Sequence, residues 1–162
     1  MQEPKIVELK QIEVLYVRKE GDYNKSAKEA WEVLMGFAYK NKIKYKKNLM
    51  GKDAMMFGIG HDNPNVIHKD KLRFDACISW DDKTVRPEGE ISNKIINGGK
   101  YAMFLHRGAY VNLKSTYDMI RNWIVKSGFK TKDLPMFEKY LNRDPRRTKS
   151  QNLKTEIYIP IN

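Results

Sequence analysis

Four segments of the chain show the hydrophobic periodicity of regular secondary structure. Apolar and polar residues alternate in Ile12–Arg18 and in Tyr101–His106, which is typical of β-strands. In Ser26–Lys42, and again in Leu113–Ser127, apolar residues recur every three or four positions, as in an amphipathic helix. Gly128 stands where such a helix commonly ends. Each half of the chain is therefore predicted to contain a strand followed by a helix.

Two further strands follow each predicted helix. In the first half they lie around Met56-Phe57 and at Leu72–Ile78, and in the second half around Met136-Phe137 and at Leu153–Ile159. The segment Asp81–Glu90 is rich in charge and contains a proline and a glycine, which is typical of a linker. The predicted order in both halves is thus strand, helix, strand, strand.

The two halves also match each other residue by residue. Gly21-Asp22-Tyr23 corresponds to Gly108-Ala109-Tyr110 at an offset of 87 positions. The middle and last strands recur at offsets of 80 and 81 positions. Three matching blocks in the same order indicate an internal duplication. We therefore predict an α+β fold for one domain, residues 1–162, built from two strand–helix–strand–strand (SHS2) modules at about residues 1–80 and 91–162.

Strand alternation assigns the side chains of each predicted sheet to two faces. In the middle strands, Phe57 and Phe137 are predicted to face the helix, which leaves Gly58 and Glu138 on the other face. Where the two modules adjoin, that other face is predicted to hold six side chains: Tyr16, Tyr101, Met103, Glu138, Tyr140 and Tyr158.

This aromatic face has two interpretations. Large apolar side chains commonly pack two modules together, and the face is then part of the core. Alternatively, it forms a cleft for a flat, apolar, cationic compound, because aromatic rings attract cations. Glu138 favours the cleft, since a carboxylate on a buried aromatic face is costly without a partner.

The chain is basic, with 31 Lys and Arg against 20 Asp and Glu and a formal net charge of +11. Much of this charge lies in Lys40–Lys52 and Arg143–Lys149. Clustered cations can bind nucleic acid by releasing counterions from its phosphates. Both runs also lie among turn-forming residues, where they are expected as solvated loops. We expect no specific nucleic-acid partner.

Other chemistry is sparse in the sequence. The single cysteine, Cys77, excludes a disulfide framework, and the three histidines are not spaced as metal ligands. There is also no phosphate-binding glycine loop. From these three observations together, neither a cofactor nor a metal is expected. The chain also has neither an apolar run of membrane-spanning length nor a secretory leader, which predicts a cytoplasmic protein without a membrane partner.

The sequence resembles the GyrI-like small-molecule-binding family, which includes effector-binding domains of AraC- and MerR-type multidrug regulators and stand-alone gyrase-inhibitory proteins. Seven motifs carry the resemblance over nearly the whole chain: Arg18–Tyr23, Gly58–Pro64, Lys71–Ile78, Gly98–Ala102, His106–Tyr110, Phe137–Asn142 and Thr155–Ile161. The resemblance implies a pseudo-twofold pair of modules whose antiparallel sheets form a ligand cleft. It also implies that Glu138 and Tyr158 line this cleft.

The expected function is therefore binding of hydrophobic, planar, often cationic small molecules around Glu138, as a sequestering or sensing protein. Tyr110 and Trp123 complete the expected ligand-binding set. The resemblance leaves two alternatives. One is a hydrolase of cyclopropane-bearing genotoxins, in which Glu138, helped by a cleft tyrosine or Trp123, acts on a water molecule. The other is an inhibitor that interacts with DNA gyrase, or a partner of a transcription regulator.

Overall fold

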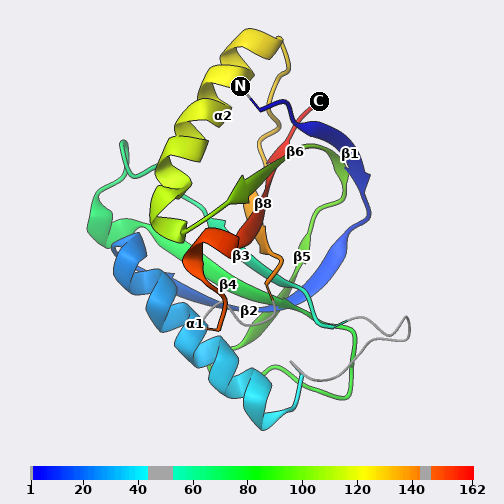
Figure 1. Cartoon of the computed structure of the whole chain (residues 1–162). Coiled ribbons are helices and arrows are strands. Elements are labelled where there is room, and N and C mark those ends of the chain that lie inside the picture. Colours follow the sequence, from blue (N-terminus) through cyan, green and yellow to red (C-terminus); the bar gives the residue numbers. More distant parts are fainter. Residues whose placement is uncertain (1, 44–52, 143–146) are drawn as a thin grey trace. The chain divides into compact units, whose positions relative to one another are not determined.

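The computed structural model describes residues 2–43, 53–142 and 147–162, which form two compact units (Figure 1). The first unit comprises Gln11–Asn97, and the second comprises Met1–Lys10 together with Gly98–Asn162. Residues 44–52 and 143–146, which hold much of the two basic runs, lie outside the described residues. None of the described helices is long and apolar enough to cross a membrane.

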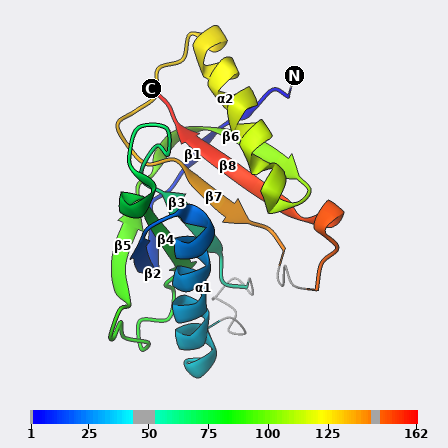
Figure 2. The same ribbon diagram turned by 90° about the vertical axis from the view of Figure 1, so that its left-hand side faces the viewer.

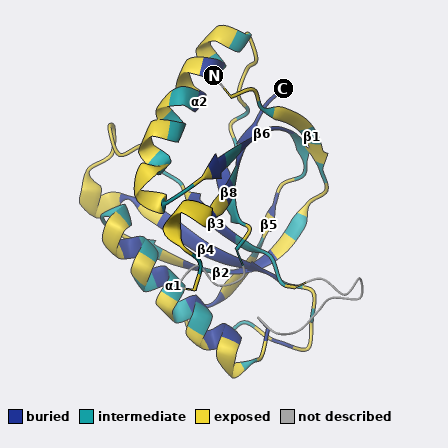
Figure 3. Cartoon of the chain, in the orientation of Figure 1, coloured by how far each residue is buried: buried dark blue, intermediate teal, exposed yellow. Residues whose placement is uncertain are grey.

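The first unit is an antiparallel four-stranded sheet with one α-helix packed on it. Its strands lie in the order β3-β4-β2-β5. The helix contacts β2 and β4, and its buried and exposed residues alternate along its length (Figure 3). In chain order the elements are β2 (Ile12–Glu20), α1 (Tyr23–Lys40), β3 (Met56–Gly60), β4 (Arg73–Ser79) and β5 (Ser92–Ile96).

Helix α1 begins three residues before its predicted start because Asp22 caps it. The Asp22 side chain accepts a hydrogen bond from the backbone N–H of Asn24, which satisfies a donor that the first turn leaves free. The apolar stripe of the helix, including Leu34 and Phe37, is buried against the sheet as the periodicity predicts.

The second unit repeats this arrangement with the strand order β1-β6-β8-β7. In Figure 2, α2 lies over β6 and β8, where Ile120 and Trp123 join Phe104 and Ile157 in a buried core. Helix α2 has the predicted bounds and ends at Gly128, whose φ of 76° is left-handed. The elements are β1 (Lys5–Leu9), β6 (Gly99–Arg107), α2 (Leu113–Ser127), β7 (Phe137–Tyr140) and β8 (Lys154–Pro160).

Equivalent hydrogen bonds tie the same turn in both units. Gly21 donates its N–H to the carbonyl of Leu72 at 2.8 Å, and Gly108 donates to the carbonyl of Leu153 at 2.8 Å. Their φ angles are +137° and +120°, which glycine adopts without strain. The predicted α+β fold is therefore confirmed, and both units contain the order strand, helix, strand, strand.

Two strands were not predicted, and each is the outer strand of a sheet. Strand β1, from the N-terminus, pairs with β6, while β5 pairs with β2. The predicted linker Asp81–Glu90 thus leads into a strand of the first unit, which extends to Asn97. Both strands are short and partly exposed, so their hydrophobic pattern is weak.

The predicted faces of the middle strands are wrong. Residues directly opposite each other in an antiparallel sheet share a face. Phe57 lies opposite Cys77 and Phe137 opposite Tyr158, so both phenylalanines are on the face away from the helix. Glu138 lies opposite Ile157, which is in the core beneath α2. Glu138 is therefore on the helix-covered face of its sheet.

Candidate functional site

Glu138 is the centre of a polar cluster in the second unit. The hydroxyl of Tyr117 donates a hydrogen bond to Oε1 of Glu138 at 2.6 Å, and the hydroxyl of Tyr140 donates to Oε2 at 2.8 Å. Glu138 is half-buried on β7, Tyr140 follows two positions along the same strand, and Tyr117 comes from α2. The carboxylate is thus held between a strand and a helix.

Aromatic rings extend this cluster. The ring of Tyr110 packs edge-on against that of Tyr140, with 5.8 Å between the ring centroids. Tyr110 precedes α2 and is 37% exposed, so ligands can reach its ring. A carboxylate beside an accessible aromatic ring can bind a cation by charge and by its attraction to the ring.

Burial raises the pKa of Glu138, because a charged carboxylate loses hydration there. The hydrogen bonds from Tyr117 and Tyr140 oppose this rise, since they stabilise the ionised form. The pKa of Tyr140 is raised well above its ordinary value, first by burial and then by the neighbouring carboxylate. Tyr140 therefore keeps its proton and remains a hydrogen-bond donor.

No lysine or arginine pairs with Glu138 among the residues that the structure describes. The carboxylate consequently has hydrogen-bond donors but no described lysine or arginine to balance its charge, and His106 is the one basic side chain that acts on its pKa, lowering it. The described residues also contain no group of three or more metal-ligating side chains. The arrangement is suited to binding an organic cation.

Three of the other predicted residues lie on the opposite face of the same sheet. The rings of Tyr101 and Tyr158 meet edge-on at 6.1 Å, and both contact the ring of Phe137. Tyr101 and Tyr158 are buried, and Met103 lies directly opposite Tyr158 in the ladder. The prediction that Glu138 shares a face with this group is wrong, because the pairing of β7 with β8 separates them.

Trp123 and Tyr16 lie elsewhere. Trp123 packs edge-on against Phe104 in the core beneath α2, and its Nε1–H donates to Glu3 at 3.4 Å. Tyr16 belongs to the first unit and lies opposite Cys77, on the face away from α1. Cys77 is fully buried, and burial raises the pKa of its thiol to about 12, so it is not a nucleophile.

Sequence reasoning missed Tyr117, which periodicity assigns to the apolar stripe of α2. The duplication contains the signal that identifies it. At the offsets of the repeat, Tyr117, Glu138 and Tyr140 correspond to three small residues of the first half: Ala30, Gly58 and Gly60. The first module builds the same fold with small residues at these three positions. The large polar side chains of the second module are therefore not needed for the fold.

Two relatives match this chain over most of the length of both sequences. The chain is 31% identical over 109 residues to a probable transcriptional regulator, YgiV, of Escherichia coli K12, covering 67% of this chain and 68% of YgiV. It is 29% identical over 139 residues to a DNA gyrase inhibitor of Erwinia billingiae, covering 81% of this chain and 84% of the inhibitor.

Three solved structures share the fold. The EcmrR chain in its DNA complex has a TM-score of 0.75 at 19% identity, and the match covers 97% of this chain but only 56% of EcmrR. SAV2435 bound to tetraphenylphosphonium has a TM-score of 0.63 at 16% identity, covering 99% of this chain and 94% of SAV2435. A hydrolase encoded by lin2189 from Listeria innocua has a TM-score of 0.69 at 15% identity, covering 99% of this chain and 92% of the hydrolase.

At these identities the solved structures establish the fold alone. The family assignment rests on the sequence, because the model of the GyrI-like small molecule binding domain matches residues 2–162. The chain therefore belongs to the family of GyrI-like small-molecule-binding domains.

Proposed function

We propose that the protein binds hydrophobic, often cationic, planar small molecules, and that Glu138 supplies the counter-charge. The observation that carries this proposal is a half-buried carboxylate that accepts hydrogen bonds from two tyrosine hydroxyls and pairs with no described lysine or arginine. Placing such a carboxylate away from water is costly, and a ligand cation would offset that cost.

The comparison of the two modules supports a binding role over a structural one. The first unit forms the same helix and sheet with Ala30, Gly58 and Gly60 at the equivalent positions. The fold therefore does not require Tyr117, Glu138 and Tyr140.

The family supports a small-molecule ligand, and one structural neighbour supports its hydrophobic and cationic character. The family is described as binding small molecules, and SAV2435 was solved with tetraphenylphosphonium, a hydrophobic cation. We assign Glu138, Tyr110 and Tyr140 to the ligand site, with Tyr117 orienting the carboxylate. A ligand-binding role for the other predicted residues stays a prediction: Tyr16, Tyr101, Met103, Tyr158 and Trp123.

A pair of ions with one shape and opposite charge tests the role of Glu138. Tetraphenylphosphonium and tetraphenylborate have the same outline, so their difference in affinity reports charge. Glu138→Gln should weaken tetraphenylphosphonium binding about ten- to a hundred-fold, as expected for a lost interaction with a charged group. Tetraphenylborate binding should stay equal or strengthen.

Glu156→Gln is the matched control, because Glu156 is also half-buried but has Lys139 at 4.0 Å. It removes the same charge from the neighbouring strand and should leave both affinities unchanged. Melting temperatures of both variants check that the fold is intact. Equal losses of both ligands in Glu138→Gln would contradict the counter-charge role, and so would equal losses of the cation in the two variants.

A further inference from the structure

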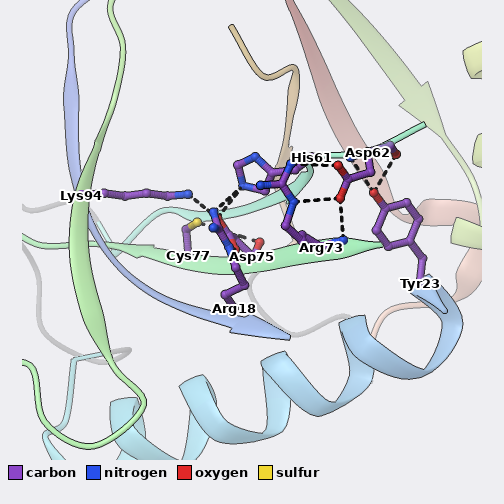
Figure 4. A network of polar contacts seen from close by, with 8 residues as sticks. All are labelled: Arg18, Tyr23, His61, Asp62, Arg73, Asp75, Cys77 and Lys94. Carbon is purple, nitrogen blue, oxygen red and sulfur yellow. Dashed lines mark hydrogen bonds and ion pairs between the residues drawn. The ribbon is translucent and has the colours of Figure 1, made fainter. Parts of the chain in front are cut away.

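Two cationic side chains and a histidine meet at one buried carboxylate in the first unit (Figure 4). Asp75 on β4 is fully buried and accepts hydrogen bonds from Arg18, through Nε at 2.7 Å and Nη2 at 3.0 Å. His61 Nε2 lies 2.6 Å from Oδ2 of Asp75. Lys94 from β5 also donates to Oδ2. All members of this Asp75 cluster belong to the first unit, whereas the Glu138 site is built from residues of the second.

The cluster lies on the face of the sheet away from α1 and remains accessible. Arg18 lies directly opposite Asp75, and the side chains of Arg18 and Lys94 are 40% and 22% exposed. The ring of Tyr16 lies beside both cations, with its centroid 4.4 Å from Lys94 Nζ and 6.0 Å from Arg18 Cζ. Contact with the ring holds the two cations in place.

The cluster carries more positive charge and more donors than Asp75 can satisfy. Arg18 and Lys94 bring two positive charges against one negative charge. Arg18 Nη1 donates to none of the described residues, and Lys94 donates to Asp75 alone among them. The nearby Asp62 does not balance the excess, because its carboxylate is paired with Arg73 at 2.8 Å.

The second unit shows that the module does not need this cluster. Arg18 and His61 correspond at the repeat offsets to Leu105 and Leu141. Lys94 lies opposite Val14 on β2. The residue equivalent to Val14 is Tyr101, which lies opposite Val7, so Val7 occupies the position that corresponds to Lys94. Each of these three basic side chains thus has an apolar counterpart. The equivalent of Asp75 is Glu156, whose partners are Lys139 at 4.0 Å and the hydroxyl of Tyr158, which donates at 3.1 Å.

Buried ion pairs add little net stability, because well-packed apolar residues often replace them without loss. The second unit is a natural example of such a replacement. The excess charge and the unused donors of the cluster are suited to an anion, because Arg and Lys form strong charge-assisted hydrogen bonds to oxyanions such as phosphate.

We propose that Arg18, His61 and Lys94 form a binding site for a small oxyanion, best matched by a phosphate group. Asp75 positions these three side chains and does not contact the anion. Burial alone would raise the pKa of Asp75, but its hydrogen bonds from His61, Arg18 and Lys94 hold that pKa well below its ordinary range. Asp75 therefore stays ionised and keeps the donors in place.

Inorganic phosphate added to the full-length protein, with chloride withdrawn to hold ionic strength constant, tests this site. Two-dimensional NMR spectra should show saturable shifts of the Arg18 Nε–H and of the backbone amides of Tyr16 and Asp75. Lys94→Val, the residue type at the equivalent position, should weaken phosphate binding about ten-fold or more. Shifts that rise linearly without saturation in the wild type would overturn the proposal.

Lys19→Val is the matched control, because Lys19 is the neighbour of Arg18 on the other face of β2 and pairs with Glu90 at 2.7 Å. It removes the same charge and should leave phosphate affinity unchanged. Lys94→Gln keeps a donor toward Asp75 and serves if Lys94→Val fails to fold, with the same expected loss. Equal loss in the Lys19 and Lys94 variants would mean that net charge alone attracts phosphate, and the site would be rejected.

Discussion

Tyr117→Phe tests how the Glu138 carboxylate is tuned, because it removes only one hydroxyl. That hydroxyl donates to Oε1 of Glu138 at 2.6 Å and stabilises the ionised form. Burial already raises the pKa of Glu138, and loss of the hydrogen bond raises it further. A carboxyl group with a raised pKa is ionised only when the pH lies above that raised value. If a hydrophobic cation binds the ionised form, its affinity falls as the pH falls, and in the variant this fall begins at a higher pH.

The size of the effect follows from the hydrogen bond. A hydrogen bond to a charged group contributes roughly 1.5 to 3 kcal/mol, and about 1.4 kcal/mol corresponds to a factor of ten. On the acidic side of the transition, Tyr117→Phe should therefore bind tetraphenylphosphonium about ten- to a hundred-fold more weakly than the wild type. On the alkaline side both carboxylates are ionised, so the affinities should converge. Tyr140→Phe, whose hydroxyl donates at 2.8 Å, should behave similarly.

The measurement is calorimetric titration of tetraphenylphosphonium over a range of pH. Tyr110→Phe is the control, because Tyr110 contacts the ring of Tyr140 but donates no hydrogen bond to Glu138 within the described part of the chain. Any loss in Tyr110→Phe should be the same at every pH. If the Tyr117 and Tyr110 variants show the same pH profile, hydrogen bonding does not control the ionisation of Glu138 and the reasoning is refuted.

Three further predictions concern stability. In urea titrations, Asp75→Asn should lower the free energy of unfolding by about 2 to 4 kcal/mol, a range that allows for the exposure of Arg18. Glu156→Gln should lower it by less than about 1 kcal/mol. Because the folded-state pKa of Asp75 is depressed, its contribution is complete above the ordinary carboxyl pKa of about 3.9 and is lost as the pH falls below it, so wild type and Asp75→Asn should converge in acid. Gly21→Ala and Gly108→Ala should each lower the free energy of unfolding by about 1 to 3 kcal/mol in thermal unfolding, because alanine is strained at their positive φ angles. No atom crowds either position, so a smaller loss would contradict backbone strain.

The elements that could be predicted from the sequence are those with one buried face. Helix α2 has its predicted bounds, whereas α1 begins three residues before its predicted start, where Asp22 caps it, and ends at Lys40 rather than at Lys42. The turn glycines Gly21 and Gly108 could be paired because the offset of the repeat aligns them. Strands β1 and β5 could not be found in this way, since they are outer strands whose residues are only partly buried.

The face on which Glu138 lies could not be predicted from alternation. Alternation shows which residues of a strand share a face, but the choice between the two faces requires knowing which one the helix covers. Large apolar residues favour the face that packs in the core, and Phe57 and Phe137 are indeed fully or almost fully buried. They are buried on the face away from the helix, so apolar character did not identify the helix side.

The duplication identifies both sites more directly than alternation does. Two modules with one fold share the residues that the fold requires, and positions at which one has small or apolar residues and the other has charged ones are free to serve a separate purpose. Glu138 stands where the first module has Gly58, and Arg18 stands where the second has Leu105. The two exchanges run in opposite directions and lie on opposite faces, since Glu138 faces α2 and Arg18 lies on the face away from α1. The second module therefore has an unbalanced carboxylate on one face, and the first module has unbalanced cations on the other. The ligand class proposed for each site follows from the sign of its excess charge.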